Sequence, residues 1–407
     1  MTPAARVAAA ADILDVWRAG DERAEAILRR WGRENRYAGS KDRRAISDIV
    51  YDCLRRRRSY GFLGDGENGR ALTLGRAMAA GGDPARTFSG EGHAPAALSA
   101  SEARRAATIG DGAARALAEA PVGVKLDVPD WLLAPLRTAL GDEFEDGLRV
   151  MRERAPIDLR VNRLRADPQA ARAALAEHDP SLVPEPVEEA PDALRLPPGA
   201  RIADARALEE GLVELQDAAS QAGAALADPR PGEAILDYCA GGGGKALAFA
   251  SLTGGEARIV AHDVAPERMR DLPTRAGRAG ARIEIARSAE LEALVGACDL
   301  VFVDAPCSGS GVWRRDPEAK WRLTPARLET LRAAQAEAAR EALRYLKPDG
   351  RLAYATCSLL AEENAAQTEA LLSSISGARL IEQRLWRPGA PGDGFFCAVI
   401  ATSGGKG

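Results

Sequence analysis

The sequence predicts an α/β fold for the C-terminal half of the chain, built on a parallel sheet with helices on both faces. Over residues 212–403, short apolar segments alternate with helical ones, which is the pattern of consecutive βαβ units. A glycine-rich loop follows the first expected strand, and chemically reactive residues follow two later ones, as at a ligand site. The expected strands are 234–237, 258–262, 282–286, 299–303, 351–355 and 395–401.

The N-terminal part is predicted to be helical. Apolar residues at Ile46, Ile49, Val50 and Cys53 follow the spacing of an amphipathic helix. Residues 1–60 hold 14 Lys/Arg against 9 Asp/Glu and end near a run of four arginines, 55–58. That run is either a solvated helix end or a contact for nucleic-acid phosphates. Residues 61–120 are expected to continue the helical domain.

A small α+β module is predicted next. Residues 157–163 alternate apolar and polar side chains like a half-buried strand, and Asp167 with Pro168 is typical of a helix start. Arg160, Asn162 and Arg163 on the strand are either plain surface residues or ligand contacts. We therefore expect three domains, 1–125, 126–210 and 211–407.

Composition narrows the class of protein. The chain has 407 residues, a net charge of −4, three histidines and six cysteines without a C-x-x-C pair. These numbers argue against a zinc site and against a disulfide framework. No signal peptide or transmembrane run is present. We expect a cytoplasmic, reduced protein that uses no metal and no membrane.

Two of the expected strands each lead to a cysteine. The strand 299–303 runs into Asp304 and then Cys307, and the strand 351–355 runs into Thr356 and Cys357. If these strands are neighbours, about 4.8 Å apart, both thiols can face one substrate. A single free cysteine is usually a small buried apolar residue, which is our interpretation of Cys53, Cys298 and Cys397. The two strand-end cysteines together indicate catalysis.

The loop after strand 234–237 reads Tyr238-Cys-Ala-Gly-Gly-Gly-Gly-Lys245. A phosphate-binding P-loop fits poorly, because Cys239 replaces the first glycine and Ala246 follows the lysine. A dinucleotide site is not cleanly matched either, and S-adenosylmethionine fits best. Asp263, at the end of the second strand, would hold ribose hydroxyls in either of the last two cases.

With these residues in hand, the sequence resembles the RsmB/Nop/Sun family of RNA cytosine-5 methyltransferases. The resemblance covers residues 130–403 well, and residues 1–60 resemble more loosely the NusB-like domain of the bacterial ribosomal RNA branch. It implies a Rossmann-like class I methyltransferase domain behind a helical domain and an α+β RNA-binding module. The motifs that carry it are Asp304-Ala-Pro-Cys-Ser-Gly309, Arg314-Arg-Asp-Pro-Glu-Ala-Lys-Trp321, Tyr354-Ala-Thr-Cys-Ser358, Glu363-Asn364 and Asp393-Gly-Phe-Phe396.

The resemblance implies roles for individual residues. Cys357 is expected to attack the base, Cys307 to assist release, and Asp304 to hold the base edge. The residues expected to contact RNA are Arg160, Asn162, Arg163, Arg315 and Lys320. Those expected at the cofactor are Cys239, Ala240, Gly241, Gly242, Gly243, Gly244, Lys245, Asp263, Arg268, Ser288 and Asp304.

The chain departs from the family pattern at two places. Gly241 and Gly242 replace the usual Ala-Pro, which predicts a more flexible cofactor loop. Ser288 stands where the family usually has an aspartate for the adenine side.

The function predicted from the sequence is S-adenosylmethionine-dependent formation of 5-methylcytosine in ribosomal RNA, by a monomer. One alternative keeps the chemistry and moves the substrate to transfer RNA. Another is a catalytically idle RNA-binding or assembly protein. A DNA methyltransferase would place its nucleophile at Cys307 instead.

Overall fold

The computed structural model describes residues 1–402, which form two compact units. Unit 1 comprises residues 1–134, 148–153 and 313–322. Unit 2 comprises, among the described residues, 135–147, 154–312 and 323–402. The three domains expected from the sequence stay a prediction.

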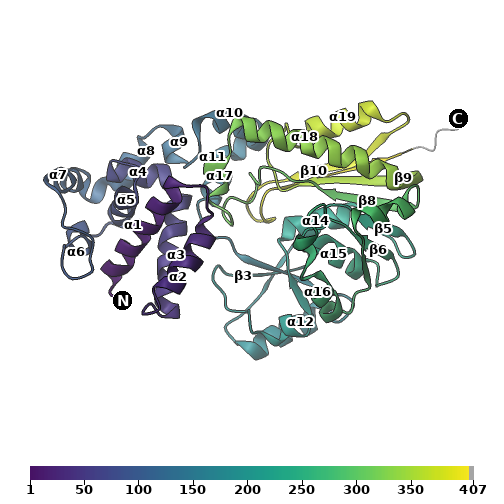
Figure 1. Ribbon diagram of the computed structural model, residues 1–407, viewed down its shortest axis with the longest axis horizontal. Helices are drawn as coiled ribbons and strands as arrows, with labels where there is room; N and C mark the ends of the chain where they lie inside the picture. The colour runs from purple at the N-terminus through teal and green to yellow at the C-terminus, as the bar shows by residue number, and fades with distance from the viewer. Residues whose placement is uncertain (403–407) are drawn as a thin grey trace. The chain divides into compact units, whose positions relative to one another are not determined.

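Unit 1 is helical, as predicted (Figure 1). Among the helices of residues 1–402, none is long and apolar enough to cross a membrane. Two helices, α10 (Leu133–Leu140) and α11 (Phe144–Val150), lie where the chain passes between the units. The helices of unit 1 are α1 (Pro3–Ala19), α2 (Ala24–Glu34), α3 (Ser40–Arg55), α4 (Arg57–Gly64), α5 (Gly69–Ala79), α6 (Pro84–Thr87), α7 (Ala100–Ile109), α8 (Ala113–Ala118), α9 (Val122–Lys125) and α17 (Ala319–Arg322).

Local sequence explains where these helices start and which face they bury. The Thr2 hydroxyl accepts a hydrogen bond from Ala5 N, and Pro3 occupies the first turn of α1. The predicted stripe of α3, including Ile46, Ile49 and Val50, is buried against α1 and α2. The amphipathic pattern is therefore confirmed.

The four arginines at 55–58 are engaged within unit 1. The four residues span the junction of α3 and α4 and are partly buried, so they do not form a solvated helix end. Each guanidinium has an internal partner: Arg55 bonds to Arg314 O, Arg56 to Asp52, Arg57 to Glu67, and Arg58 to Val128 O and Asp130. Their main role in the structure is to join segments of the helical unit.

The α+β module of unit 2 is an antiparallel sheet of order β2-β3-β1-β4, with α12 (Pro168–His178) and α13 (Arg206–Glu209). Asp158 on β1 is buried and pairs with Arg195 on β3, and it also accepts a bond from Ala218 N. The strands are β1 (Ile157–Val161), β2 (Glu185–Val187), β3 (Ala190–Leu196) and β4 (Val213–Leu215).

The large sheet has the order β10-β11-β9-β8-β5-β6-β7 and is mixed, which corrects the prediction of a parallel sheet. The inner pairs are parallel, but β11 runs antiparallel to both of its neighbours. The sequence did not reveal β10, because nearly all of its side chains are exposed and leave no apolar pattern. The strands are β5 (Ala234–Asp237), β6 (Arg258–Ala261), β7 (Ile283–Ile285), β8 (Cys298–Asp304), β9 (Leu346–Thr356), β10 (Arg379–Trp386) and β11 (Phe395–Ala401).

Helices cover both faces of the large sheet, which confirms the predicted Rossmann-like architecture. In Figure 1, α18 (Pro325–Ala342) and α19 (Ala365–Ser374) lie on one face, and α14 (Ala218–Leu226), α15 (Gly244–Leu252) and α16 (Leu272–Ala279) lie on the other. Successive residues of β8 alternate between the two cores: Leu300 and Phe302 face one, and Val301 and Val303 face the other. The sheet is thus buried on both sides, and ligands meet it at its edge.

Residues 313–322 belong to unit 1, although the chain on either side belongs to unit 2. The Glu318 carboxylate is 2% exposed and accepts hydrogen bonds from Trp17 Nε1 (2.8 Å), Ala24 N (3.1 Å) and Arg23 Nε (3.2 Å). Trp321 Nε1 donates to Leu54 O at 2.6 Å. This segment therefore closes the core of the helical unit.

We expect Glu318→Ala to destabilise unit 1, because it leaves the buried N–H groups of Trp17 and Ala24 without an acceptor. The cost should be about 2–4 kcal/mol. Hydrogen exchange of the α1 and α2 amides measures the change locally, and urea unfolding measures it globally. The control is Glu329→Ala, which removes only an exposed pair with Arg332 and should change stability by less than about 0.5 kcal/mol. Equal effects from the two variants would contradict this role for Glu318.

Candidate active site

The two strand-end cysteines meet. Strands β8 and β9 are parallel neighbours, with Asp304 opposite Ala355, so their carboxyl ends lie at the same edge. Cys307 follows β8 and Cys357 follows β9, and their Sγ atoms are 3.3 Å apart. Both side chains are partly buried free thiols. The predicted adjacency of the strands is confirmed, and it brings both sulfurs to one place.

A single buried carboxylate joins the two thiol-bearing loops. Glu363 is fully buried, and its Oε1 accepts bonds from Ser308 N (2.8 Å) and from Gln335 Nε2 (2.9 Å). Its Oε2 accepts bonds from the hydroxyls of Ser308 and Ser358. These serines directly follow the two cysteines, so one acid sits behind both thiols.

The two thiols differ from the other cysteines in what surrounds them. The hydrogen bond to Cys357, followed by burial and the charge of Glu363, raises the pKa of Cys307 well above its ordinary value. At neutral pH, Cys307 therefore carries its proton and can donate it toward the Cys357 sulfur. For Cys298 and Cys397, burial raises the pKa to about 11 and about 12, as expected for core residues.

Asp304 is paired with a lysine from the glycine loop. Lys245 Nζ donates to Asp304 Oδ2 at 2.9 Å, and the lysine side chain is buried. Its ammonium also lies 4.7 Å from the centre of the Phe395 ring. The Lys245 ammonium is thus held between an acid and an aromatic face, and its bond to Asp304 orients that carboxylate at the end of β8.

The glycine loop is held by backbone geometry. It joins β5 to α15, with φ of +53° at Gly241 and +79° at Gly243, conformations that favour glycine. Ala240 N donates to His262 O, and Gly243 N donates to Ala240 O, both at 2.8 Å. Although Gly241 and Gly242 replace the usual Ala-Pro, the loop thus has a defined set of hydrogen bonds.

Asp263, at the end of β6, is tied to this loop. Its Oδ2 accepts bonds from Gly241 N at 2.9 Å and from Arg268 Nη1 at 3.0 Å, and its Oδ1 accepts one from Ala265 N. Arg268 is more than half exposed and covers the acid. Ser288 is exposed, and its hydroxyl bonds to His262 Nε2 at 3.1 Å.

The residues at this edge fit S-adenosylmethionine, which carries two positive charges. Asp237, Asp263 and Asp304 stand at the ends of the neighbouring strands β5, β6 and β8. Asp237 Oδ1 is buried without a hydrogen-bond partner, while its Oδ2 accepts a bond from Ala246 N. Such an acid-rich edge favours a cation. Across residues 1–402, no three His, Cys, Asp or Glu side chains gather as a metal site.

The residues predicted to contact RNA are divided between the two units, and three of them are buried. Arg160 and Asn162 are buried: Arg160 Nη1 donates to Leu247 O, and Asn162 Nδ2 donates to Gly211 O and Ala279 O. Lys320 is 1% exposed inside unit 1 and donates to Arg55 O. Arg163 and Arg315 are exposed. The three buried side chains are used inside the protein, so we leave them out of any RNA contact.

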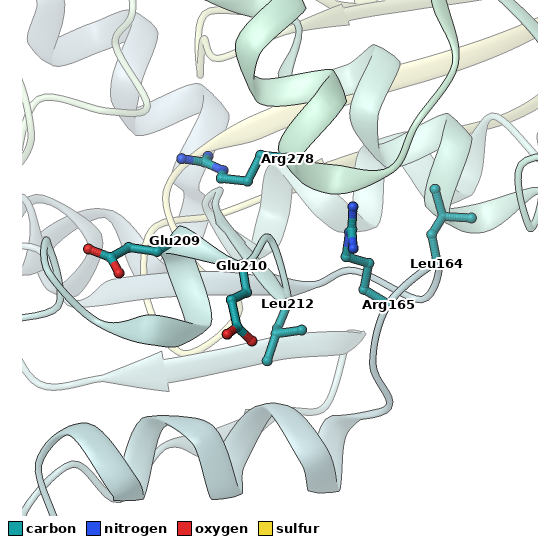
Figure 2. A pocket seen from close by; sticks show the side chains of 6 residues that line it. All are labelled: Leu164, Arg165, Glu209, Glu210, Leu212 and Arg278. Carbon is teal, nitrogen blue, oxygen red and sulfur yellow. The ribbon is translucent and has the colours of Figure 1, made fainter.

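Figure 2 shows a recess in unit 2. Its volume is about 540 Å³, and two of its lining residues, Leu164 and Arg165, directly follow Arg163 in the chain. It combines two arginines with two glutamates, so it lacks the excess positive charge expected of a groove for RNA phosphates. Its lining residues are Leu164, Arg165, Glu209, Glu210, Leu212 and Arg278.

Sequence reasoning missed the residues behind the thiols. Glu363, Ser308 and Ser358 stand in the sequence only as members of motifs without a role of their own, and no pattern points to Gln335. Since Glu363 lies six residues beyond Cys357 and fifty-five beyond Ser308, its role depends on the pairing of β8 with β9. The signal available in the sequence was a glutamate close to an apolar strand, because a glutamate that is buried must have bonding partners.

Comparison with protein families identifies two segments. Residues 224–395 match the model described as 16S rRNA methyltransferase RsmB/F, and residues 128–203 match the ferredoxin-like domain of RsmF/B-like methyltransferases. Together these segments cover more than half of the chain.

Curated relatives point the same way. The chain is 33% identical over 284 residues to ribosomal RNA small subunit methyltransferase B of Serratia proteamaculans, and 34% identical over 286 residues to that of an Escherichia coli strain. Each alignment covers 67% of this chain and 66% of the relative, just under two thirds of the relative's length.

Solved structures share the fold. The structure of PH0851 matches with a TM-score of 0.74 and 23% identity, covering 98% of this chain and 99% of its own. NSun6 from Pyrococcus horikoshii matches with a TM-score of 0.60 and 19% identity, covering 67% of this chain and 98% of its own.

We expect Asp237 to make stability depend on pH. Burial, and then the charge of Asp304, raises its pKa from 3.8 to about 7. The folded state then holds this proton more tightly than the unfolded chain, so this group's contribution to stability falls as pH rises from about 4 to about 7. Asp237→Asn, which stays neutral, should lose that fall in melting temperature.

The control for this measurement is Asp271→Asn, at an exposed aspartate. It should keep the pH profile of the unmodified protein. If the Asp237→Asn profile matches it too, Asp237 does not titrate in this range.

Proposed function

The chain belongs to the RsmB/F family of methyltransferases, and we propose on that premise that it methylates carbon-5 of a cytosine in ribosomal RNA. The observation that carries the proposal is the pair of thiols 3.3 Å apart, one of which follows the strand that ends at the lysine-bonded Asp304. The names of the curated relatives concern small-subunit ribosomal RNA, which favours that substrate class over transfer RNA.

Carbon-5 of cytosine is a poor nucleophile, so the reaction needs covalent help. We assign Cys357 as the residue whose thiolate adds to carbon-6, making carbon-5 nucleophilic. The addition places extra electron density on the ring; Asp304 is suited to hold the base edge, and the Lys245 ammonium bonded to it offsets the negative charge there. The bond to Lys245 keeps the Asp304 carboxylate in one orientation.

The cofactor is S-adenosylmethionine, which supplies an electrophilic methyl group when bound. We propose that the loop from Cys239 to Lys245 and the acid Asp263 hold it, with Arg268 and Ser288 at the margin. Burial raises the pKa of Cys239 to about 12, so this thiol stays protonated and does not compete as a nucleophile.

After methylation, carbon-5 carries both a proton and the methyl group. A base must take that proton so that the electrons of the C–H bond restore the ring and expel the Cys357 sulfur from carbon-6. We assign this step to Cys307. The hydrogen bond to Cys357 is the largest cause of its raised pKa, and that cause weakens once Cys357 is bonded to carbon. Cys307 can then lose its own proton to solvent and, as a thiolate, accept the carbon-5 proton.

The target base must leave its stack to reach two partly buried thiols, as base-modifying enzymes generally require. Arg163 and Arg315 are exposed and are the predicted RNA-contact residues that stay in the proposal. Both have charged partners or other interactions within the protein, so we expect them to contribute modestly.

We expect Cys357→Ala to abolish methyl transfer, lowering it by about a thousandfold or more, as removal of a covalent nucleophile does. The measurement is tritiated methyl transfer to separated ribosomal and transfer RNA, followed by mapping of the labelled base. Label at carbon-5 of a cytosine in small-subunit ribosomal RNA is the expected result. The control is Cys298→Ala, a buried thiol at the other end of β8. An active Cys357→Ala enzyme would falsify the nucleophile assignment.

Cys307→Ala should behave differently, because addition and methylation can proceed while proton removal fails. We expect a covalent protein–RNA adduct that survives denaturing electrophoresis and is absent from the double variant Cys307→Ala/Cys357→Ala. A Cys307→Ala enzyme that is inactive and forms no adduct would instead assign the nucleophile to Cys307.

A further inference from the structure

We propose that Glu363 is the positioning residue of the thiol pair: its buried carboxylate bonds to the serines that follow the two cysteines and fixes the spacing of both cysteine loops. Glu363 does not line the place where the base would react. It acts through the serines that follow each cysteine. As a statement about reaction steps, this inference rests on the proposed function.

The spacing follows from the bonds to one side chain. Oε1 holds the loop after β8 through Ser308 N, and Oε2 holds both loops through the Ser308 and Ser358 hydroxyls. A carboxylate has acceptor sites for all of these donors at once, whereas an amide offers a single oxygen. Replacing the carboxylate by an amide therefore leaves donors from the two loops without an acceptor and loosens both loops.

The carboxylate is itself held from behind. Gln335 Nε2, from α18, donates to Oε1 at 2.9 Å and also to Pro306 O at 2.9 Å. The Tyr354 hydroxyl donates to the backbone carbonyl of Glu363 at 2.7 Å. The side chain thus has one position, defined by β9, α18 and the loop before α19. Such support from the surroundings is what precise placement of reactive atoms requires.

The charge matters because of what else faces Cys307. The groups whose charges act on Cys307 include Cys357 and Glu363, and Tyr354 faces the same two groups, Cys307 and Glu363. A negative charge on Cys307 would therefore meet the carboxylate of Glu363 in a buried setting. The charge of Glu363 contributes to the raised pKa of Cys307, together with the hydrogen bond to Cys357 and burial. Cys307 then keeps its proton until Cys357 has reacted.

This arrangement gives the two thiols different roles although they are close and chemically alike. Cys357 is the thiol that attacks, and Cys307, whose ionisation Glu363 opposes, serves the later removal of the carbon-5 proton. Without Glu363, Cys307 would ionise more readily and would compete with Cys357 for carbon-6 of the cytosine. We therefore expect loss of the charge to disturb the order of the steps and to leave RNA binding intact.

The test is Glu363→Gln, which keeps the size of the side chain and removes its charge. In the full-length protein without RNA, alkylation of Cys307 by iodoacetamide is followed against pH by mass spectrometry. We expect the rate near pH 8 to rise about tenfold, because the thiolate fraction of Cys307 increases once the opposing charge is removed. In the methyl-transfer assay, kcat should fall by on the order of a hundredfold with KM for RNA unchanged, as for misplaced reactive groups.

The matched control is Glu362→Gln, the same substitution one residue earlier, at a partly exposed side chain. It should leave the alkylation profile and kcat within about twofold of the unmodified protein. Ser358→Ala, which removes the Ser358 hydroxyl and its bond to Oε2 but keeps the carboxylate, tests spacing apart from charge. We expect it to lower kcat without raising the alkylation rate of Cys307.

The outcomes separate this inference from the proposed function. An unchanged Cys307 alkylation profile in folded Glu363→Gln, as judged by melting temperature, overturns the inference even if methyl transfer is observed. If the profile shifts as expected but the unmodified protein methylates no RNA, the proposed function fails and the assignment of Glu363 stands. If Glu363→Gln does not fold, the Ser308→Ala/Ser358→Ala double variant must lower kcat more than either single variant, or the inference is wrong.

Discussion

The parallel pairing of β8 with β9 is the constraint on which the rest of the site depends. Each strand is an apolar segment that ends at a polar residue, and parallel pairing places both ends at one edge of the sheet. The register that sets Asp304 opposite Ala355 brings the following loops together, and the sulfurs come to 3.3 Å. If the pairing of β8 with β9 shifted by one residue, every side chain of the strand, including that of Asp304, would turn to the opposite face of the sheet. The packing of the two buried strands therefore fixes the positions of the reactive side chains.

The thiol loop is also the point where the chain leaves unit 2. Gly311 N donates to Cys357 O, and from Trp313 to Arg322 the chain belongs to the core of unit 1 before it returns at Leu323. Within that segment Lys320 is buried, and burial lowers its pKa to about 7. A buried lysine costs free energy of desolvation, which the bond to Arg55 O and the charge of Asp127 offset here. The basic residues of this motif thus serve the helical unit first, and only Arg315 is exposed.

Sequence patterns predicted features that depend on local periodicity or on strand ends. The buried strands, the stripe of α3 and the meeting of the two cysteines all follow from short segments whose apolar pattern is clear. The exposed strand β10 and the antiparallel edge lack such a pattern. For Arg160 and Asn162, residue type suggested contact with a ligand, yet both side chains bond to backbone carbonyls of distant segments. Only tertiary structure distinguishes these two uses of a polar residue, as it does for Glu363.

The electrostatics of the sheet edge explain why its cofactor should be a cation. Asp237, Asp263 and Asp304 lie near one another, and Lys245 and Arg268 are the cations bonded to two of them. Asp237 is buried, its Oδ1 has no partner, and its pKa is raised to about 7, so at neutral pH it is ionised in only part of the molecules. A positively charged ligand nearby would favour the ionised form. By linkage, the same ligand would bind more tightly as pH rises through 7, because fewer protons would have to leave. The Asp237 carboxyl group therefore contributes to the affinity of this edge for a sulfonium cofactor.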